Sequence, residues 1–448
     1  MPLARPFGRA LVVVALANLL FLALVYLAQG DRCAVLSRVQ SAFETGELTT
    51  RDFLYLDHRR GWFQFDDCNA LQMLINEDSP RLRRALAPRV FQENEDWEGQ
   101  CRVLRYLASE WVDPRQLLSI RYSRYWHGYN VIVAFALRHM ELRDLRRLLT
   151  SGVWLSIGLL ALAAWRSGPR VRRTGLIIAA VASTVWAVPY FAPGLTQGPG
   201  DALLFLALAA IAARPKMAAD AGRIVPYAAG FGALVVFLEM LTGKLPTAIA
   251  LLAAITLAAA RDENGPVVGG WPARGLALLA VTGFVLGAAA TVVAKLLLAG
   301  TLVEPQASAN FVARLSEYIG MPYYYSRWLG PLERHLPAIL YPFARMARQS
   351  HMLTYGHSRA GFGLVAATGL AWLAAAVRGW RARHSEHGRD VLFLVGAAMV
   401  PAVWVLLLPL HAYIHAPFMV RMLIVPATLG PLALCWPRAR EEVPPGAR

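Results

Sequence analysis

The sequence predicts an all-α polytopic membrane protein with about ten transmembrane helices. Hydrophobic residues make up 56% of the 448 residues, and only 17% are charged. The mean hydropathy is +0.41. About ten apolar runs, most of them long enough for a span, alternate with polar loops. A soluble protein of this size would be less apolar, so we expect the bilayer to be the solvent of this chain.

The first apolar run, Ala10 to Ala28, follows Arg5 and Arg9, as in a signal peptide or an N-terminal anchor. It has about 19 residues, enough to cross about 30 Å of hydrocarbon. No small-x-small cleavage pattern is evident after it. We therefore expect residues 1–28 to hold a retained transmembrane helix. Whether this segment is cleaved or retained, the segment after it should lie outside the cytoplasm.

Nine further apolar runs follow at intervals along the chain. They are 148–165, 174–190, 200–213, 224–241, 246–260, 275–299, 359–377, 391–408 and 418–436. The run 200–213 is short for a span, so we expect it to be tilted, extended or only partly spanning.

Arginine and lysine residues gather in the loops of one side. They are Arg166, Arg170, Arg172, Arg173, Arg214, Lys216, Arg223, Arg261, Arg274, Arg378, Arg381, Arg383, Arg389, Arg438, Arg440 and Arg448. The positive-inside rule makes this side cytoplasmic, with both termini and the tail 437–448 inside. The net charge of +16 is then a topology signal, and we expect no nucleic-acid partner.

Two long polar segments are left on the outer side, 29–147 and 300–358, with transmembrane regions 148–299 and 359–436 after them. We expect the first segment to form short juxtamembrane helices rather than a separate large domain. Its end, Asn130 to Leu149, is predicted to be one interfacial helix that leads into the second span. The second segment is rich in Tyr, Arg and His.

Cysteine spacing bears on the compartment and on cofactors. Cys33, Cys68 and Cys101 lie in the first outer segment, where an oxidising compartment permits one disulfide of open pairing, and Cys435 ends the last apolar run. No C-x-x-C, H-E-x-x-H, Walker A or G-x-G-x-x-G motif stands where it would have meaning. This argues against an ATP-driven pump and against an enzyme with a soluble cofactor.

The adjacent acids Asp66 and Asp67 are the sharpest candidate site. A carboxylate at the outer membrane surface can accept a proton from an acceptor hydroxyl. Two adjacent acids can also hold a divalent cation, although we expect no metal and no cofactor. The alternative is that one acid caps a helix beginning near Asn69, because Asp is a favoured N-cap residue.

The stretch Arg124–Tyr129 (R-Y-W-H-G-Y) combines a cation, a titratable ring and aromatic faces. Arg124 and His127 suit a phosphate, whereas Trp126 and Tyr129 suit a sugar ring. The alternative is an aromatic belt at the headgroup level.

Glu239 lies near the outer end of an apolar run, five residues before Lys244. Charged residues in such runs are costly and usually face a cavity, so both are candidates for sugar or acceptor binding. A Glu239–Lys244 pair, or simple snorkelling at the interface, is the alternative.

His411 and His415 share one face if their segment is helical, and Arg421 lies just inside the outer end of the last run. These three are candidates for binding a donor phosphate, and plain placement at the membrane interface is the alternative for the two histidines. We expect no metal site here, because no third ligand is nearby.

Together these features resemble the GT-C superfamily of polytopic glycosyltransferases. The likeness covers the whole chain: an N-terminal span, a long outer loop with the Asp66–Asp67 acids, then many spans. The stretches Arg124–Tyr129, Phe237–Thr242 and Ala412–His415 are similar to those of a narrower group of bacterial membrane proteins, and type IV pilin arabinofuranosyltransferases are similar too. The acids follow the first span by about 38 residues. That is farther than in many relatives, so Asp31 stays open as the base.

The resemblance implies a glycosyltransferase of the bacterial inner membrane with a periplasmic active site. It would transfer a sugar, with arabinofuranose as one candidate, from a polyprenyl-phosphate donor to an acceptor glycan or pilin-like protein. Asp67 or Asp66 would be the general base, with inversion at the anomeric carbon. The rivals are a transporter or flippase of a lipid-linked sugar, an O-antigen ligase or polymerase, and a non-catalytic scaffold. A transporter would show paired charges at mid-span.

Overall fold

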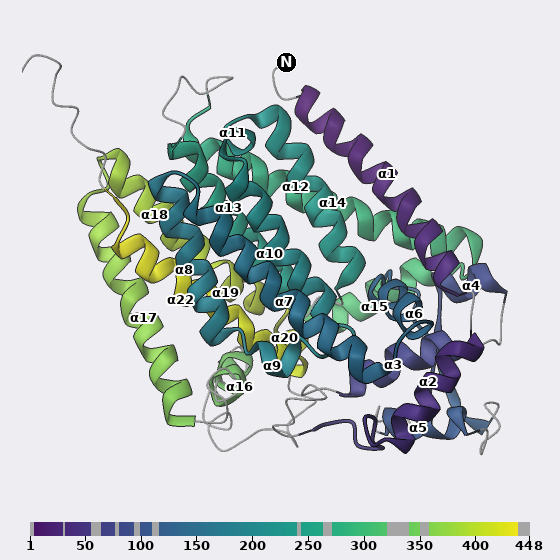
Figure 1. Ribbon diagram of the computed structural model, residues 1–448. Coiled ribbons are helices and arrows are strands. Elements are labelled where there is room, and N and C mark those ends of the chain that lie inside the picture. Colours follow the sequence, from purple (N-terminus) through teal and green to yellow (C-terminus); the bar gives the residue numbers. More distant parts are fainter. Residues whose placement is uncertain are drawn as a thin grey trace, which may run out of the picture.

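A bundle of long helices forms the body of the molecule, and shorter helices form a layer at one end of it, which we call the end layer (Figure 1). The computed structural model describes residues 4–29, 32–54, 64–76, 80–93, 99–109, 116–239, 243–262, 271–319, 340–349 and 358–437. The bundle contains α1 (Ala4–Ala28), α7 (Leu142–Trp165), α8 (Pro169–Val185), α10 (Gly198–Ala213), α12 (Ala221–Leu238), α13 (Lys244–Asp262), α14 (Ala273–Leu302), α17 (Ser358–Arg381), α18 (Glu386–Ala398), α19 (Val400–Leu407) and α22 (Ile424–Leu434).

The end layer lies in the lower and right-hand part of Figure 1. It contains α2 (Arg32–Glu44), α3 (Gln64–Ile75), α4 (Arg81–Leu86), α5 (Gln100–Ala108), α6 (Tyr129–Leu137), α9 (Val188–Phe191), α15 (Ala307–Ile319), α16 (Tyr341–Gln349) and α20 (Pro409–Ile414). The turns α21 (Ala416–Met419) and η6 (Val420–Leu423) join α20 to α22, and α11 (Pro215–Ala218) lies at the opposite end of the bundle.

Eight helices of the described part are long and apolar enough to cross a membrane, so the protein is embedded in a membrane. They are Ala4–Ala28, Leu142–Trp165, Ala221–Leu238, Lys244–Asp262, Ala273–Leu302, Arg359–Arg381, Glu386–Leu407 and Ala416–Leu434. The two remaining apolar runs form α8 and α10, which have 17 and 16 residues. The prediction of an all-α polytopic membrane protein is confirmed, and the count of ten spans stays a prediction.

Helices α12 and α14 pack closely because small residues face each other. A Cβ atom added to Gly287 would lie 1.9 Å from the carbonyl oxygen of Ala229, which leaves no room for any side chain. Such small-residue contacts let helix backbones approach each other in a membrane. Helix α1 lies against this pair, where the Asn18 amide donates to the Thr291 hydroxyl at 3.2 Å. The first apolar run is therefore part of the bundle.

The end of the bundle opposite the end layer is tied by charged side chains. Arg261 of α13 forms two hydrogen bonds of 2.8 Å to Asp390 of α18, and it also pairs with Glu386 at 2.7 Å. Asp262 accepts hydrogen bonds from the backbone N–H groups of Arg170 and Val171 at the start of α8. The positive-inside rule assigned these loops to one side of the membrane, and the contacts place them together at one end of the bundle. We call it the basic end.

The end layer differs in two places from the sequence-based expectation. Residues 130–149 do not form one interfacial helix, because α6 ends at Leu137 and α7 begins only at Leu142. Two short strands also pair antiparallel, β1 (Arg89–Gln92) with β2 (Leu118–Arg121), and Val90 lies opposite Ile120. Strands this short carry too little alternation to be recognised from sequence.

Candidate functional site

The acid pair lies inside the first turn of α3 rather than before it. The described helix starts at Gln64, so neither Asp66 nor Asp67 occupies the N-cap that a helix beginning near Asn69 would require. Negative charge in the first turn is still favourable, because the helix dipole is positive there. Neighbouring residues of a helix point about 100° apart, and the two acids consequently have different surroundings.

Asp67 is fully occupied by contacts within the protein. Its side chain is buried, and one oxygen accepts a 2.8 Å hydrogen bond from Arg146 Nη2. The other oxygen accepts from the backbone N–H of Leu195 at 2.7 Å. Arg146 is itself buried and donates to the Glu47 carboxylate at 3.0 Å. Asp67 therefore joins α3 to α7 and to the segment after α9.

Asp66 has the opposite character. Its carboxylate is half-buried, and no described residue forms a hydrogen bond or an ion pair with it. Desolvation, together with the adjacent charge of Asp67, raises its pKa from 3.8 to about 7, against an opposing effect of Lys244. A carboxylate that is without a partner and titrates near neutrality is able to accept a proton.

A disulfide holds this turn of α3. Cys68 is bonded to Cys101 of α5, 33 residues away, while Cys33 and Cys435 are free. The pairing left open by the sequence is thus Cys68–Cys101. On α5 the backbone N–H of Cys101 also donates to Asp52 at 2.9 Å, so the bridge joins two further segments of the end layer.

We expect that replacing both bridge cysteines, Cys68→Ser with Cys101→Ser, destabilises the end layer by about 3–4 kcal/mol. The cause is the greater chain entropy of the unfolded loop. Thermal unfolding in detergent measures the loss, and a reductant should lower the melting temperature of the parent protein but not that of the double variant. A Cys33→Ser variant is the control. Equal melting temperatures for all three proteins would contradict the prediction.

The R-Y-W-H-G-Y stretch lies against the end of α12. The backbone N–H of Gly128 donates to the Phe237 carbonyl oxygen at 2.8 Å, and a Cβ atom at Gly128 would lie 2.6 Å from that oxygen. Trp126 is buried beside Phe21 and Phe237, and its indole N–H donates to the Thr291 carbonyl at 3.2 Å. Trp126 thus packs helices together and presents no free face to a sugar.

His127 and three tyrosines form an aromatic cluster beside Asp66. The buried His127 ring lies 2.8 Å from the Tyr129 hydroxyl, and the rings of Tyr122 and Tyr125 meet its edge. Burial, with a smaller effect of Lys295, lowers the pKa of His127 to about 3, so the ring is neutral. The Asp66 carboxylate helps to raise the pKa of Tyr122 and of Tyr129, after their burial, which places both phenols within its electrostatic reach.

On the bundle side of the acid pair, Arg421, Asp201 and Lys244 form a buried ionic cluster. Arg421 Nη1 lies 2.7 Å from one oxygen of Asp201, and Lys244 Nζ lies 3.4 Å from the other. Both cations also donate to the amide oxygen of Gln197, at 2.6 and 2.8 Å. The Arg421 guanidinium covers the Phe191 ring at 4.2 Å. The anionic partner expected for Arg421 is therefore a side chain of the protein, Asp201.

The turn between α9 and α10 links the acid pair to this ionic cluster. Leu195 contacts Asp67, and Gln197, two residues later, contacts Lys244 and Arg421. Glu239, at the end of α12, accepts hydrogen bonds from the backbone N–H groups of Lys244 and Leu245, at 2.7 and 3.2 Å. Glu239 therefore caps α13. Residues separated widely in the sequence meet within one site at the end of the bundle that adjoins the end layer.

His411 and His415 lie on one face, as the spacing predicted. Their ring centroids are 4.5 Å apart, and the Tyr318 ring of α15 lies 4.4 Å from that of His411. Tyr318 also interacts with Tyr125, so the histidines continue the aromatic cluster across the end layer. Arg345 of α16 covers the Tyr413 ring at 4.4 Å, and half-buried Arg124 lies over Tyr122 at 5.4 Å.

Other basic residues near the end layer do not join these clusters. Lys295 is buried, donates to the Leu86 carbonyl at 2.5 Å and lies over the Trp126 ring. Arg314 is ion-paired with Glu317. Asp31, the Tyr323–Trp328 stretch, His351 and His357 lie outside the described residues. Within the described part no three His, Cys, Asp or Glu side chains gather as a metal site.

The sequence did not single out several residues of the site, among them Tyr122 and Tyr318 of the aromatic cluster. Arg146 stood among other arginines of a predicted interfacial helix, and Asp201 opened a short apolar run after Gly198-Pro199-Gly200. An acid at the start of an apolar run was the signal available for Asp201. Glu47 and Gln197 carry no such signal. Comparisons with protein-family models, curated proteins and solved structures find no match to this chain.

Proposed function

We propose that the protein is a GT-C-like glycosyltransferase that uses a polyprenyl-phosphate sugar as donor. The proposal rests on one observation. The half-buried Asp66 carboxylate, with a pKa raised to about 7, lies within electrostatic reach of Tyr129 in the aromatic cluster and of Lys244 in the ionic cluster. This arrangement stands at the end of membrane-spanning helices, where a membrane-borne donor can meet a water-borne acceptor.

In this proposal Asp66, rather than Asp67, is the general base that takes the proton of the acceptor hydroxyl. The hydroxyl oxygen attacks the anomeric carbon, the bond to the lipid phosphate breaks, and the phosphate leaves as an anion. Attack opposite the leaving group inverts the anomeric configuration. Asp67 acts as a positioning residue, because both its oxygens are already bound.

Arg124, whose guanidinium lies over the Tyr122 ring, is the candidate cation for stabilising the leaving phosphate. The rings of His411 and His415 are candidate hydrogen-bond donors to the same phosphate. Preformed donors are most effective where charge grows in the transition state. Arg421 and Lys244 hold Gln197 and Asp201 in place instead. Tyr125, which is only partly buried, is the candidate sugar contact, whereas Tyr122 and Tyr129 are buried like Trp126.

The direct test incubates purified protein with a panel of radiolabelled polyprenyl-phosphate sugars, including arabinofuranose, and with glycan or pilin-like acceptors. The expected result is release of polyprenyl phosphate together with a labelled acceptor, abolished in Asp66→Asn. Absence of release with every donor would overturn the proposal.

The pH dependence follows from the raised pKa of Asp66. A base must be deprotonated, so kcat/KM should fall about tenfold per pH unit below pH of about 7. A carboxylate with an ordinary pKa would keep kcat/KM constant down to about pH 5. Initial rates between pH 5 and 9 measure this. A flat profile over that range would exclude Asp66 as the base.

We further propose ten spans in the bacterial inner membrane, with the basic end in the cytoplasm. α8 and α10 would complete the set. Reporter fusions at Gly168 and His387 should read cytoplasmic, and fusions at Thr45 and Gln306 periplasmic. A periplasmic result at His387 would reverse the orientation.

A transporter or flippase of a lipid-linked sugar is the second candidate, because the Asp201–Arg421–Lys244 cluster is the kind of buried pairing that carriers use. Its place is less typical of a carrier. Asp201 lies in the first turn of α10 and Lys244 begins α13, so the cluster lies at the helix ends, whereas carriers hold such charges near mid-bilayer. Uptake of a lipid-linked sugar into vesicles without release of polyprenyl phosphate would favour the transporter.

A further inference from the structure

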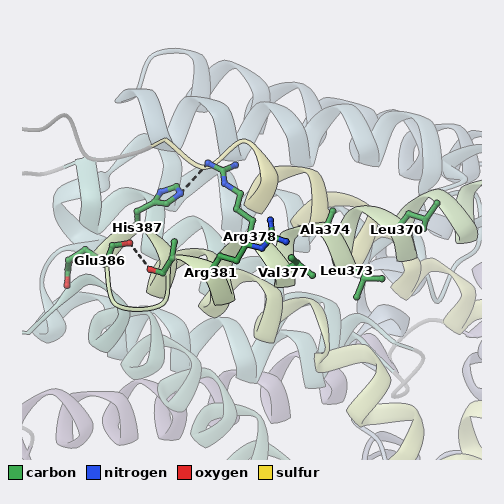
Figure 2. A pocket seen from close by; sticks show the side chains of 10 residues that line it. Leu370, Leu373, Ala374, Val377, Arg378, Arg381, Glu386 and His387 are labelled. Atoms are coloured by element: carbon green, nitrogen blue, oxygen red, sulfur yellow. Dashed lines mark hydrogen bonds between the residues drawn. The ribbon is translucent and has the colours of Figure 1, made fainter.

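A groove opens between α17 and α18 at the basic end, far from the acid pair. Its volume is about 950 Å³, near the upper end of the range of about 300–1,000 Å³ found for ligand pockets. Figure 2 shows that Leu370, Leu373, Val377, Arg378 and Arg381 follow one another along α17. The groove shares no residue with the site described above.

The lining changes from apolar to basic along the helix. Leu370, Leu373 and Val377 are 68%, 54% and 44% exposed, and they lead to Arg378 and Arg381 in the last turn. Leu370 and Arg381 are eleven residues apart, which corresponds to about 16 Å along a helix, close to half of the hydrocarbon thickness of about 30 Å. The groove thus reaches from the membrane surface to about the bilayer middle.

The basic end of the groove keeps an excess of positive charge. Arg378 Nη2 lies 3.2 Å from Nε2 of His387, as the dashed line in Figure 2 marks, and this contact orients the guanidinium. Among the residues that the structure describes, neither Arg378 nor Arg381 has a carboxylate within ion-pair distance. Glu386 also lines the groove, but Arg261, Arg274 and Arg389 surround and neutralise it.

We propose that this groove binds one anionic phospholipid. Arg378 and Arg381 would hold the headgroup phosphate, and Leu370, Leu373 and Val377 would contact an acyl chain. Arginine presents several N–H donors to a phosphate, and basic pockets between helices at the cytoplasmic surface suit acidic headgroups. The apolar and then basic lining along α17 matches the acyl chain and the headgroup of a phospholipid. A soluble phosphate would leave the apolar part of the groove unoccupied. This inference does not depend on the proposed enzyme activity.

Native mass spectrometry of the delipidated full-length chain tests the inference. The probes are phosphatidylglycerol, phosphatidylcholine with the same acyl chains, and glycerol 3-phosphate as the soluble headgroup. The test variant is Arg378→Ala with Arg381→Ala. The matched control is Arg172→Ala with Arg383→Ala, which removes two exposed arginines of the same end that do not line the groove. Thermal unfolding verifies that both variants are folded.

The expected result is one tightly retained phosphatidylglycerol in the parent protein and in the control. In the test variant its affinity should be lower by about tenfold or more, because charge-assisted hydrogen bonds are lost. Phosphatidylcholine should bind more weakly, and glycerol 3-phosphate should not compete. Equal retention in test and control variants would mean that the arginines only snorkel to the interface. That outcome would overturn the proposal, and so would competition by glycerol 3-phosphate. The proposal would also be wrong if the parent protein were a dimer and the test variant a monomer, because the groove would then be a contact between two copies of the chain.

Discussion

Asp66→Asn is expected to lower kcat/KM by about 10²–10⁴-fold, because the amide cannot accept the proton of the acceptor hydroxyl. The variant should keep its fold. In the parent protein, burial and Asp67 raise the pKa of the Asp66 carboxylate, so ionisation of this group costs stability as the pH rises through about 7. The neutral amide carries no such cost, and Asp66→Asn should therefore melt at the same or a higher temperature than the parent at pH 8.

Sugar transfer and thermal unfolding of the same preparation measure both expectations. Asp66→Glu is the informative companion, because it retains a base at a shifted position and should recover part of the rate. Loss of stability equal to that of a core variant, with normal turnover in the molecules that remain folded, would show that Asp66 is structural. In that case Asp31, which the sequence left open, becomes the next acid to replace.

Arg146→Ala should have the largest effect on stability of the changes considered. The substitution leaves Asp67 and Glu47 buried without their shared cation. Removing one partner of a buried ion pair costs about 3–5 kcal/mol, because the remaining charge is desolvated and uncompensated. Arg146→Lys should lose less stability, since lysine keeps the positive charge. It cannot contact Asp67 and Glu47 through two separate nitrogen atoms as the guanidinium does.

Arg147→Ala is the matched control, one residue along the same helix. Its side chain is 71% exposed and, among the residues that the structure describes, pairs with Asp144 alone, so the variant should unfold within about 0.5 kcal/mol of the parent. Guanidinium or thermal unfolding in detergent measures both. If Arg146→Ala and Arg147→Ala unfold alike, the Asp67–Arg146–Glu47 contacts contribute no stability, and Asp67 is again open as the base.

Local properties of the chain were predictable from its sequence. Hydropathy identified every apolar run that forms a bundle helix, because apolar length is read within a short window. Charge in the loops grouped Arg170, Arg261 and Arg389 on one side, and the structure brings them to one end. The spacing of His411 and His415 predicted a shared face, since residues four apart are neighbours on a helix.

Partnerships between distant residues could not be predicted in the same way. Asp66 and Asp67 are adjacent residues of the same type, and only the position of Arg146 in the folded protein decides which carboxylate forms the ion pair. Arg421 showed the need for an anion, but Asp201 lies 220 residues earlier and carries no mark of that pairing. The break between α6 and α7 was missed because apolar residues continue on both sides of Arg138–Glu141.

The Asp201–Arg421 pair also bears on biogenesis. Asp201 and Lys244 leave the ribosome long before Arg421, which belongs to the last part of the bundle. A lone charged residue costs about 2.5–3.5 kcal/mol at the centre of an inserting helix, less toward its ends. Lys244 can neutralise Asp201 during that interval, because the two already lie within 3.4 Å in the finished protein. Arrival of Arg421 then completes the cluster, so a chain interrupted before its final helix keeps Asp201 with only one of its two cations.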